Sequence, residues 1–300
     1  MTPSPLALAD GRPFVTTTGQ TFDVTASGNG RAYRLFVDIP PTPPPPEGFP
    51  VITVLDGNLH FPLAAGLQRS LVLAGEARPA VVVGIGYPTE DLFAALTLRF
   101  QDLSLPARAD WLAGLGWSAP GMTVETTGGL DAFLDVLRDE IRPALAQLAP
   151  VNPADQTLFG HSLAGHAALH ALFRSPGDWR TVIASSPSIW WADDAVLAGE
   201  RTLSDPDLAG RRLLLTAGAL EAHPDRAALA HFGSRPAAEA AMSRSRMVEN
   251  VRSLGARLAA RPGAEVATVV FEGEGHVSVI PAALGRALTF ALGFDAAGVP

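Results

Sequence analysis

The chain contains no cysteine, which excludes disulfides, thiolate metal sites and a cysteine nucleophile. Charged side chains make up only 17% of its 300 residues, and the net charge of −8 comes with no basic patch to suit a nucleic acid. No apolar run approaches the roughly 18 residues that a membrane helix needs. The first residues, MTPSPLALADGRPF, lack the features of a signal peptide. We therefore expect a cytoplasmic protein with neither nucleic acid nor membrane as partner.

What the chain has in quantity is apolar side chains, which account for 47% of its residues and suit a large core. Several short segments rich in Val, Ile and Leu have the length and apolar character of strands in a parallel sheet covered on both faces. These segments are residues 49–57, 79–88, 156–162, 181–191, 211–221 and 264–276. An earlier segment, 31–40, alternates in polarity and is typical of a half-exposed strand.

Helical patterns lie between and after these strands, at residues 129–148, 163–174, 237–260 and 281–294. Alternating strands and helices predict a doubly wound α/β fold, with a mostly parallel sheet and helices on both faces. We expect one domain over residues 1–300, of which about the first 30 form an extension or edge strands. Residues 105–129 form a long segment in which the apolar residues show little periodicity, and this predicts a lid-like loop.

Residues 160–165, Gly-His-Ser-Leu-Ala-Gly, fit the pattern G-x-S-x-G between an apolar segment and a helical one. In that setting the pattern is typical of a nucleophile elbow, in which a serine at a sharp turn points out of the sheet. We expect Ser162 to be a nucleophile and the N–H of Leu163 to be one oxyanion donor. A second donor is expected after an earlier strand, at Gly57 or Asn58, unless this Asp-Gly-Asn stretch is only a turn.

A serine nucleophile needs a base, and in α/β-hydrolases an acid and then a histidine follow the serine along the chain. His276 follows the last apolar segment and is the expected base. Glu221, at the end of the preceding strand segment, is the first choice for the acid. The alternatives are Asp225, an acid from elsewhere such as Asp193 or Asp194, or no acid at all.

Other histidines are weaker candidates for a catalytic or metal-binding role. His166 and His170 lie four residues apart on one predicted helix, a spacing that can hold a metal ion. No third ligand and no H-E-x-x-H pattern accompanies them, so the sequence predicts neither a metal site nor a cofactor. His161 lies within the elbow itself, and packing is its expected role.

Several segments in one order resemble the Putative esterase family of α/β-hydrolases, which includes enterochelin esterases and related siderophore trilactone hydrolases such as bacillibactin esterase. They are FPVITVLDGNLHF, VVVGIGYPTED followed by LRFQDLSLP, GGLDAFLDVLRDEIRP, FGHSLAG, ASSPSIWW and GEGHVSVIP. The resemblance begins at about residue 31 and runs to the C-terminus. It implies hydrolysis of a carboxylic ester through an acyl-enzyme, with Ser162 as nucleophile, His276 as base and Gly57 or Asn58 in the oxyanion hole.

The resemblance also implies that Arg99 contacts a small-molecule ester, although from the residues alone Arg99 fits a surface ion pair equally well. We expect Asp56 to bind the substrate as well. Trp190 and Trp191 follow a predicted strand and are expected to line an aromatic pocket or else to pack in the core. The predicted function is a serine carboxylic-ester hydrolase. The alternatives are an acyltransferase on the same scaffold and a non-catalytic small-molecule-binding protein.

Overall fold

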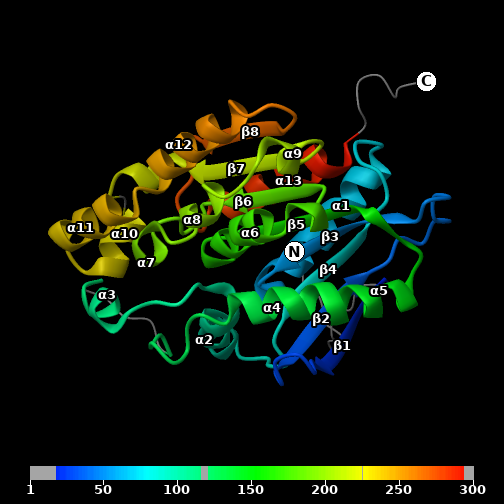
Figure 1. Ribbon diagram of the computed structural model, residues 1–300, viewed down its shortest axis with the longest axis horizontal. Helices are drawn as coiled ribbons and strands as arrows, with labels where there is room; N and C mark the ends of the chain where they lie inside the picture. Colours follow the sequence, from blue (N-terminus) through cyan, green and yellow to red (C-terminus); the bar gives the residue numbers. More distant parts are fainter. Residues whose placement is uncertain (1–17, 116–120, 225, 294–300) are drawn as a thin grey trace, which may run out of the picture.

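The computed structural model describes residues 18–115, 121–224 and 226–293. Its strands form one sheet in the order β1-β2-β4-β3-β5-β6-β7-β8 (Figure 1). The strands are β1 Gly19–Thr25, β2 Ala32–Asp38, β3 Phe49–Leu55, β4 Val81–Gly86, β5 Val151–His161, β6 Thr181–Ser185, β7 Arg212–Gly218 and β8 Glu265–Phe271. β2 pairs antiparallel with β1 and β4, and all neighbours from β4 to β8 are parallel. The mostly parallel sheet confirms the predicted fold class.

Every apolar segment that was predicted to be a strand contains one, except that β5 begins before the predicted segment 156–162, at Val151. β3 and β4 are buried along their whole length, which explains why both lack the alternation of a half-exposed strand. The expected N-terminal extension includes β1, an edge strand whose side chains alternate between exposed and half-buried. Residues 1–17 of that extension lie outside the described residues.

Helices connect the strands. They are α1 Gly57–Leu73, α2 Leu92–Leu103, α3 Ala109–Ala113, α4 Leu130–Val136, α5 Arg142–Leu148, α6 Leu163–Arg174, α7 Trp191–Asp194, α8 Leu197–Glu200, α9 Asp205–Leu208, α10 Arg226–Phe232, α11 Arg235–Ser245, α12 Met247–Ala259 and α13 Val279–Leu292. A π-helical turn, η1 (Leu137–Ile141), joins α4 to α5, so the helix predicted over residues 129–148 is continuous. Short 3-10 helices, η2 (Pro176–Asp178) and η3 (Ala219–Ala222), follow α6 and β7. No helix of the described ranges has the length and apolarity to cross a membrane.

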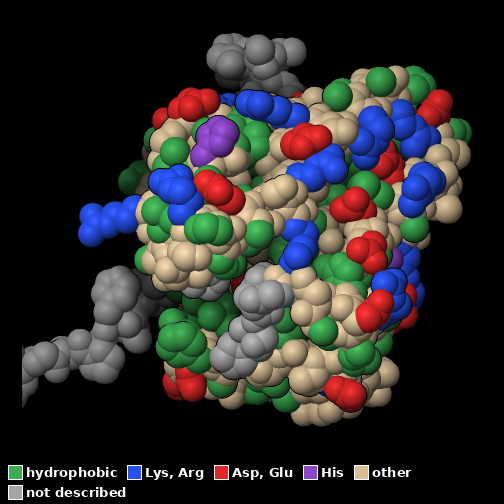
Figure 2. Space-filling view, turned by 90° about the vertical axis from the view of Figure 1, so that its left-hand side faces the viewer, with side chains coloured by type: hydrophobic (Ala, Val, Ile, Leu, Met, Phe, Trp, Pro, Cys, Tyr) green, Lys and Arg blue, Asp and Glu red, His purple; other side chains and the backbone are tan. Residues whose placement is uncertain are grey.

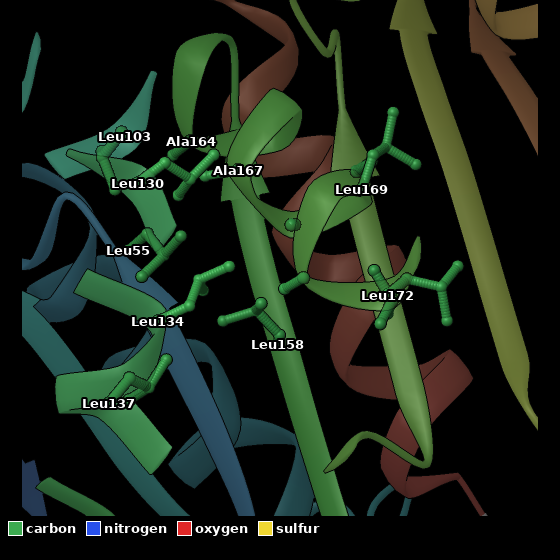
Figure 3. Close-up of a cluster of buried hydrophobic side chains, with 14 of the residues drawn as sticks. Leu55, Leu103, Leu130, Leu134, Leu137, Leu158, Ala164, Ala167, Leu169 and Leu172 are labelled. Carbon is green, nitrogen blue, oxygen red and sulfur yellow. The ribbon is translucent and has the colours of Figure 1, made fainter. Parts of the chain in front are cut away.

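The helices cover the sheet on both faces, as predicted. α4, α6 and α12 pack on one face, whereas α1 and α13 pack on the other (Figure 1). Figure 3 shows part of the first core, in which leucine and alanine side chains of α4 and α6 meet Leu55 of β3 and Leu158 of β5. The second core joins Val54 and Phe159 of the same strands to α13. Burial on both faces fixes the central strands and therefore the position of their ends.

The helix predicted over residues 237–260 is two helices, and that prediction was wrong. Arg246 takes a left-handed conformation, with φ 43° and ψ 40°, and separates α11 from α12. Neither glycine nor proline marks this break, because Arg246, a residue other than glycine, takes the left-handed conformation. The Asp-Gly-Asn stretch, for which a turn was the alternative, begins α1 at Gly57.

Candidate active site

The carboxyl ends of the parallel strands meet along one edge of the sheet, which is where open α/β sheets bind ligands. In Figure 1 this edge lies at the end of the molecule that carries α3, α7 and α11. Figure 2 views the molecule from that end, where Arg and acidic side chains alternate without forming a patch of one charge. The polar residues that follow the strand ends are Asp56 after β3, Ser162 after β5, Ser186 after β6, Glu221 after β7 and His276 after β8.

Ser162 occupies the sharp turn between β5 and α6. Its φ of 61° and ψ of −120° form a conformation that is strained for any residue but glycine. The Ser162 N–H donates to the carbonyl oxygen of Ser185 on the next strand, at 2.9 Å. The flanking glycines are required by space: a Cβ on Gly160 would overlap the Ala164 carbonyl oxygen, and one on Gly165 would lie 3.0 Å from that of Ser185. This is the backbone geometry of a nucleophile elbow.

Three side chains from separate strand ends form a hydrogen-bonded series. Ser162 Oγ lies 3.0 Å from His276 Nε2, and His276 Nδ1 lies 2.7 Å from a carboxylate oxygen of Glu221. The His276 side chain is 42% exposed and that of Glu221 only 4%, so a substrate can reach the imidazole but not the carboxylate. The structure thus brings together the residues that the sequence nominates as nucleophile, base and acid, within the distances that such a site requires.

Glu221 is held by two further donors. Its Oε1 accepts hydrogen bonds from the Ser186 hydroxyl, at 2.6 Å, and from the Gly218 N–H, at 2.7 Å. Burial raises the pKa of Glu221, but its contacts with His276, Ser186 and Gly218 outweigh burial and bring the pKa below its ordinary value. An ionised Glu221 accepts a hydrogen bond from His276 Nδ1–H, and this tautomer leaves the Nε2 lone pair facing Ser162 Oγ. Sequence analysis did not identify Ser186, whose only signal is its place after β6.

Of the other acids considered from the sequence, the structure describes Asp193 and Asp194. Asp225 lies outside the described residues. Asp193 and Asp194 are exposed, and Asp193 pairs with Arg108 at 3.4 Å. The contact between Glu221 and His276 therefore favours Glu221 among the acids that the structure describes.

Asp56 and Arg99 form a buried ion pair beside the site. Arg99 Nε and a terminal nitrogen of its guanidinium donate to the two carboxylate oxygens of Asp56, at 2.8 and 2.7 Å. Burial lowers the pKa of Arg99, but the charge and hydrogen bonds of Asp56 outweigh it and raise the pKa above its ordinary value. Asp56 thus occupies two donor nitrogens of the Arg99 guanidinium, Nε and one terminal nitrogen. Contact of Asp56 or Arg99 with substrate stays a prediction.

The expected oxyanion donors lie in the first turns of two helices. Leu163 begins α6, and Gly57 and Asn58 begin α1, where N–H groups have no acceptor within the helix. β3 and β5 pair in parallel, so these helices start from neighbouring strand ends. The Asn58 side chain is fixed by Tyr87, because its Oδ1 accepts the Tyr87 N–H at 2.7 Å and its Nδ2 donates to the Tyr87 carbonyl at 2.9 Å. The first turn of α1 is therefore held in one orientation by its contacts with Tyr87.

The two tryptophans after β6 have different surroundings. Trp191 is buried, and its indole N–H donates to the Leu105 carbonyl at 2.8 Å. Trp190 is half-buried and stacks on Trp111 of α3, with ring centroids 6.0 Å apart and 25° between the planes. A cavity of about 340 Å³ is lined by Trp111, Gly114, Leu115, Trp190, Asp193, Asp194 and Arg244. Of the two tryptophans, Trp190 faces this cavity and Trp191 packs in the core.

The segment expected to be lid-like contacts the same cavity. It contains α3, and Arg244 of α11 donates to the Leu115 carbonyl at 2.6 Å. Residues 116–120 of this segment lie outside the described part of the chain. Movement of the segment as a lid stays a prediction.

His166 and His170 do not form a site together. His166 Nδ1 lies 3.1 Å from the Ser188 carbonyl oxygen, whereas His170 Nε2 lies 2.8 Å from a carboxylate oxygen of Asp131. Burial lowers the pKa of His166 to about 3, so this ring is neutral at physiological pH. Within the described ranges, no three His, Asp or Glu side chains are grouped to hold a metal ion.

Comparison with known proteins places this chain in a family. The family described as "Putative esterase" matches residues 27–250. The chain is similar to the ferri-bacillibactin esterase BesA of Bacillus subtilis, with 32% identity over 277 residues, 90% of this chain and 88% of BesA. It is also similar to the siderophore triacetylfusarinine C esterase of Aspergillus fumigatus, with 33% identity over 251 residues, 80% of each chain.

A solved structure agrees with these relatives. The BES protein from Bacillus cereus superposes with a TM-score of 0.79 at 26% identity, over 96% of this chain and 100% of that one. The chain therefore belongs to the Putative esterase family and is an esterase with the α/β-hydrolase fold.

Proposed function

We propose that Ser162, His276 and Glu221 act as nucleophile, general base and orienting acid in the hydrolysis of carboxylic esters. The observation that carries this proposal is the unbroken series of contacts from Ser162 Oγ to His276 Nε2, at 3.0 Å, and from His276 Nδ1 to Glu221, at 2.7 Å. A serine hydroxyl becomes an effective nucleophile when an adjacent base removes its proton.

The reaction runs in two halves. Ser162 Oγ attacks the carbonyl carbon of the ester while its proton moves to His276 Nε2, and Glu221 stabilises the imidazolium that forms. The imidazolium then donates this proton to the departing alcohol, which leaves an acyl group on Ser162. In the second half, His276 removes a proton from water, which attacks the acyl carbon. The imidazolium then returns a proton to Ser162 Oγ as the bond to the acyl carbon breaks, which releases the carboxylic acid and restores Ser162 and His276.

Backbone groups stabilise the charge that develops on the carbonyl oxygen. Leu163 supplies one N–H, and Gly57 or Asn58 supplies the other, from helices that begin at neighbouring strand ends. Two preorganised donors of this kind lower the barrier because they need no rearrangement as charge develops, and each contributes about 100- to 1000-fold in turnover.

The substrate class that we infer is a siderophore ester, such as a catecholate trilactone. Two relatives carry the names of bacillibactin and triacetylfusarinine C esterases. In this chain, Trp190 and the stacked Trp111 offer a flat aromatic surface in a cavity whose charged lining consists of Arg244, Asp193 and Asp194. The aromatic surface suits an aryl group of the substrate.

The test compares wild-type protein with Ser162→Ala on p-nitrophenyl acetate, butyrate and octanoate and on a catecholate trilactone, metal-free and ferric. Trilactone cleavage well above that of the simple esters, lost in Ser162→Ala, supports the proposal. Labelling by a fluorophosphonate should disappear in the same variant. Ser175→Ala, at the other end of α6, is the matched control and should retain activity and labelling.

Two results would change this conclusion. Near-normal ester hydrolysis by Ser162→Ala would rule out the serine mechanism. Turnover of short esters without trilactone cleavage would keep the mechanism and reject the siderophore substrate. Product analysis with an added alcohol separates hydrolysis from acyl transfer, because a transferase forms the new ester.

A further inference from the structure

A second histidine lies against the proposed base. His161 is the last residue of β5, next to Ser162, and only 4% of it is exposed. Its ring centroid lies 4.8 Å from that of His276, with 43° between the ring planes. The buried ring of His60, on α1, meets His161 edge-on at 6.1 Å. Imidazoles from three different strand connections are therefore in contact, two of them buried and one exposed at the site.

The His161 ring is fixed from the neighbouring strand. Its Nδ1 lies 3.1 Å from the hydroxyl of Ser185, a fully buried residue whose carbonyl also accepts the Ser162 N–H. Its Nε2 is buried and has no hydrogen-bond partner among the described residues. Burying a polar atom in this way has a free-energy cost that an apolar side chain would avoid. The buried His166 has an unpartnered Nε2 as well, so the feature that distinguishes His161 is its contact with the ring of His276.

The charge on this ring is controlled by its surroundings. Burial is the main reason that the pKa of His161 lies well below its ordinary value. The electrostatic effects of His276, His60 and Arg99 lower the pKa further, and a contact with the His276 backbone acts in the opposite direction. Burial also lowers the pKa of His60, although Asp56 acts in the opposite direction. His161 thus stays neutral at physiological pH. A neutral ring neither repels an imidazolium on His276 nor competes with it for the serine proton.

We propose that His161 is a positioning residue, whose neutral ring supports the ring of His276 and favours its protonated form while the acyl-enzyme is made. The inference rests on the proposed function of Ser162 and His276. The face of a neutral aromatic ring attracts a cation placed over it. The contact also restricts a side chain that is otherwise 42% exposed, and a displacement of about 1 Å in such a group can cost about 100-fold in rate.

The test uses two replacements of His161 that differ in one property. His161→Phe keeps an aromatic face and loses both nitrogens, whereas His161→Leu loses the aromatic face as well. His166→Leu is the matched control, because His166 is also fully buried with an unpartnered Nε2 but belongs to no contact with His276 that the structure records. For each variant, kcat and KM on p-nitrophenyl butyrate are measured across pH, with thermal unfolding alongside.

We expect His161→Leu to lower kcat by about 10- to 100-fold at nearly constant KM, in line with loss of orientation at the reacting group. The acid limb of its pH–rate profile should move to lower pH, because the imidazolium of His276 loses its support. His161→Phe should recover most of kcat. His166→Leu should reduce stability without moving the profile.

The inference is wrong if His161→Leu has the kcat and pH profile of the wild type, or if His161→Phe is as impaired as His161→Leu. If the leucine variant does not fold, His161→Met fills the space without an aromatic face and decides the question in its place. Ser162→Ala separates the two proposals. If that variant keeps its activity, the proposed function fails, whereas an inactive Ser162→Ala beside an unaffected His161→Leu overturns the positioning role alone.

Discussion

The guanidinium of Arg99 and the carboxylate of Asp56 bind each other through two parallel hydrogen bonds, of 2.8 and 2.7 Å, with side chains only 12% and 6% exposed. Asp56 stands directly before α1 in a left-handed conformation, with φ 56° and ψ 46°. The pair therefore ties α2 to the turn that presents Gly57 and Asn58. Breaking such a pair leaves one charge buried without a partner.

Arg99→Met should destabilise the protein by about 3–5 kcal/mol, the usual result of removing one partner of a buried ion pair. It should also lower kcat, because the oxyanion loop loses its anchor. Urea unfolding and steady-state kinetics measure the two effects. Arg99→Lys keeps the positive charge but cannot make both parallel hydrogen bonds to Asp56. Its stability and kcat should lie between those of the wild type and those of Arg99→Met. A raised KM with unchanged kcat and stability would instead support the substrate contact that the family resemblance implies.

Glu221→Gln should lower kcat by about 1000- to 10,000-fold while the fold is retained, because an amide no longer fixes the proton on His276 Nδ1. Hydrolysis of p-nitrophenyl butyrate and far-ultraviolet circular dichroism report the two properties. Ser186→Ala removes a single hydrogen bond to Glu221 and should cost less than about tenfold. A glutamine variant with activity close to wild type would show that the site works as a Ser–His pair without an acid.

The buried His166 predicts a specific loss of stability in acid. Its folded-state pKa is about 3, whereas an unfolded histidine has a pKa of about 6.5. Between these values the unfolded chain binds a proton that the folded chain does not, so stability falls as pH falls through that window. His166→Leu removes this contribution. Between pH 6 and 4, its free energy of unfolding should decline less steeply than that of the wild type, by about 1.4 kcal/mol per pH unit. Equal slopes in urea titrations would contradict the assignment.

Gly160→Ala should abolish activity, because its Cβ would overlap the Ala164 carbonyl oxygen and displace the start of α6. Fluorophosphonate labelling and thermal unfolding should both be impaired. The matched substitution Gly285→Ala, in α13, meets no atom within 4 Å and should raise stability by up to about 1 kcal/mol through helix propensity. A Gly160→Ala variant that is labelled at the wild-type rate would show that the turn can relax.

The two adjacent tryptophans should respond differently to truncation. Trp190→Ala should lower kcat/KM for aryl-acyl esters by about tenfold more than for alkyl esters, since the cavity loses an aromatic face. Trp191→Ala should mainly reduce stability, by about 3–5 kcal/mol, as expected for a buried aromatic side chain. Relative rates on paired aryl and alkyl substrates make the comparison. If Trp190→Ala lowers stability and leaves the rate ratio unchanged, the cavity does not bind the acyl group.

The buried strands and the elbow can be predicted from sequence because each depends on a local pattern, such as a short apolar run or glycines around a serine. The order of serine, acid and histidine along the chain also predicts which side chains the structure brings together. The pairing of Arg99 with Asp56 and the contact of His161 with His276 depend instead on which strand ends are neighbours. The spacing of residues along the chain does not show which strand ends are neighbours in the sheet.

Surroundings at the level of single residues are equally hidden in the sequence. Trp190 and Trp191 are adjacent and chemically identical, but the direction of the chain after β6 sends one to a cavity and the other to the core. The break between α11 and α12 falls at Arg246, where no residue type announces it. The bounds of β1 could not be predicted within the expected N-terminal extension, because an edge strand needs few apolar side chains.

The position of β8 has a consequence for how the activity of the protein responds to heat. β8 lies at one edge of the sheet and pairs with β7, and the loop after it carries His276. Edge elements separate from a fold at lower free energy than central ones. Opening at this edge withdraws the imidazole from Ser162 while the inner strands remain paired. Loss of activity on mild heating should therefore precede the cooperative melting of the core and reverse on cooling.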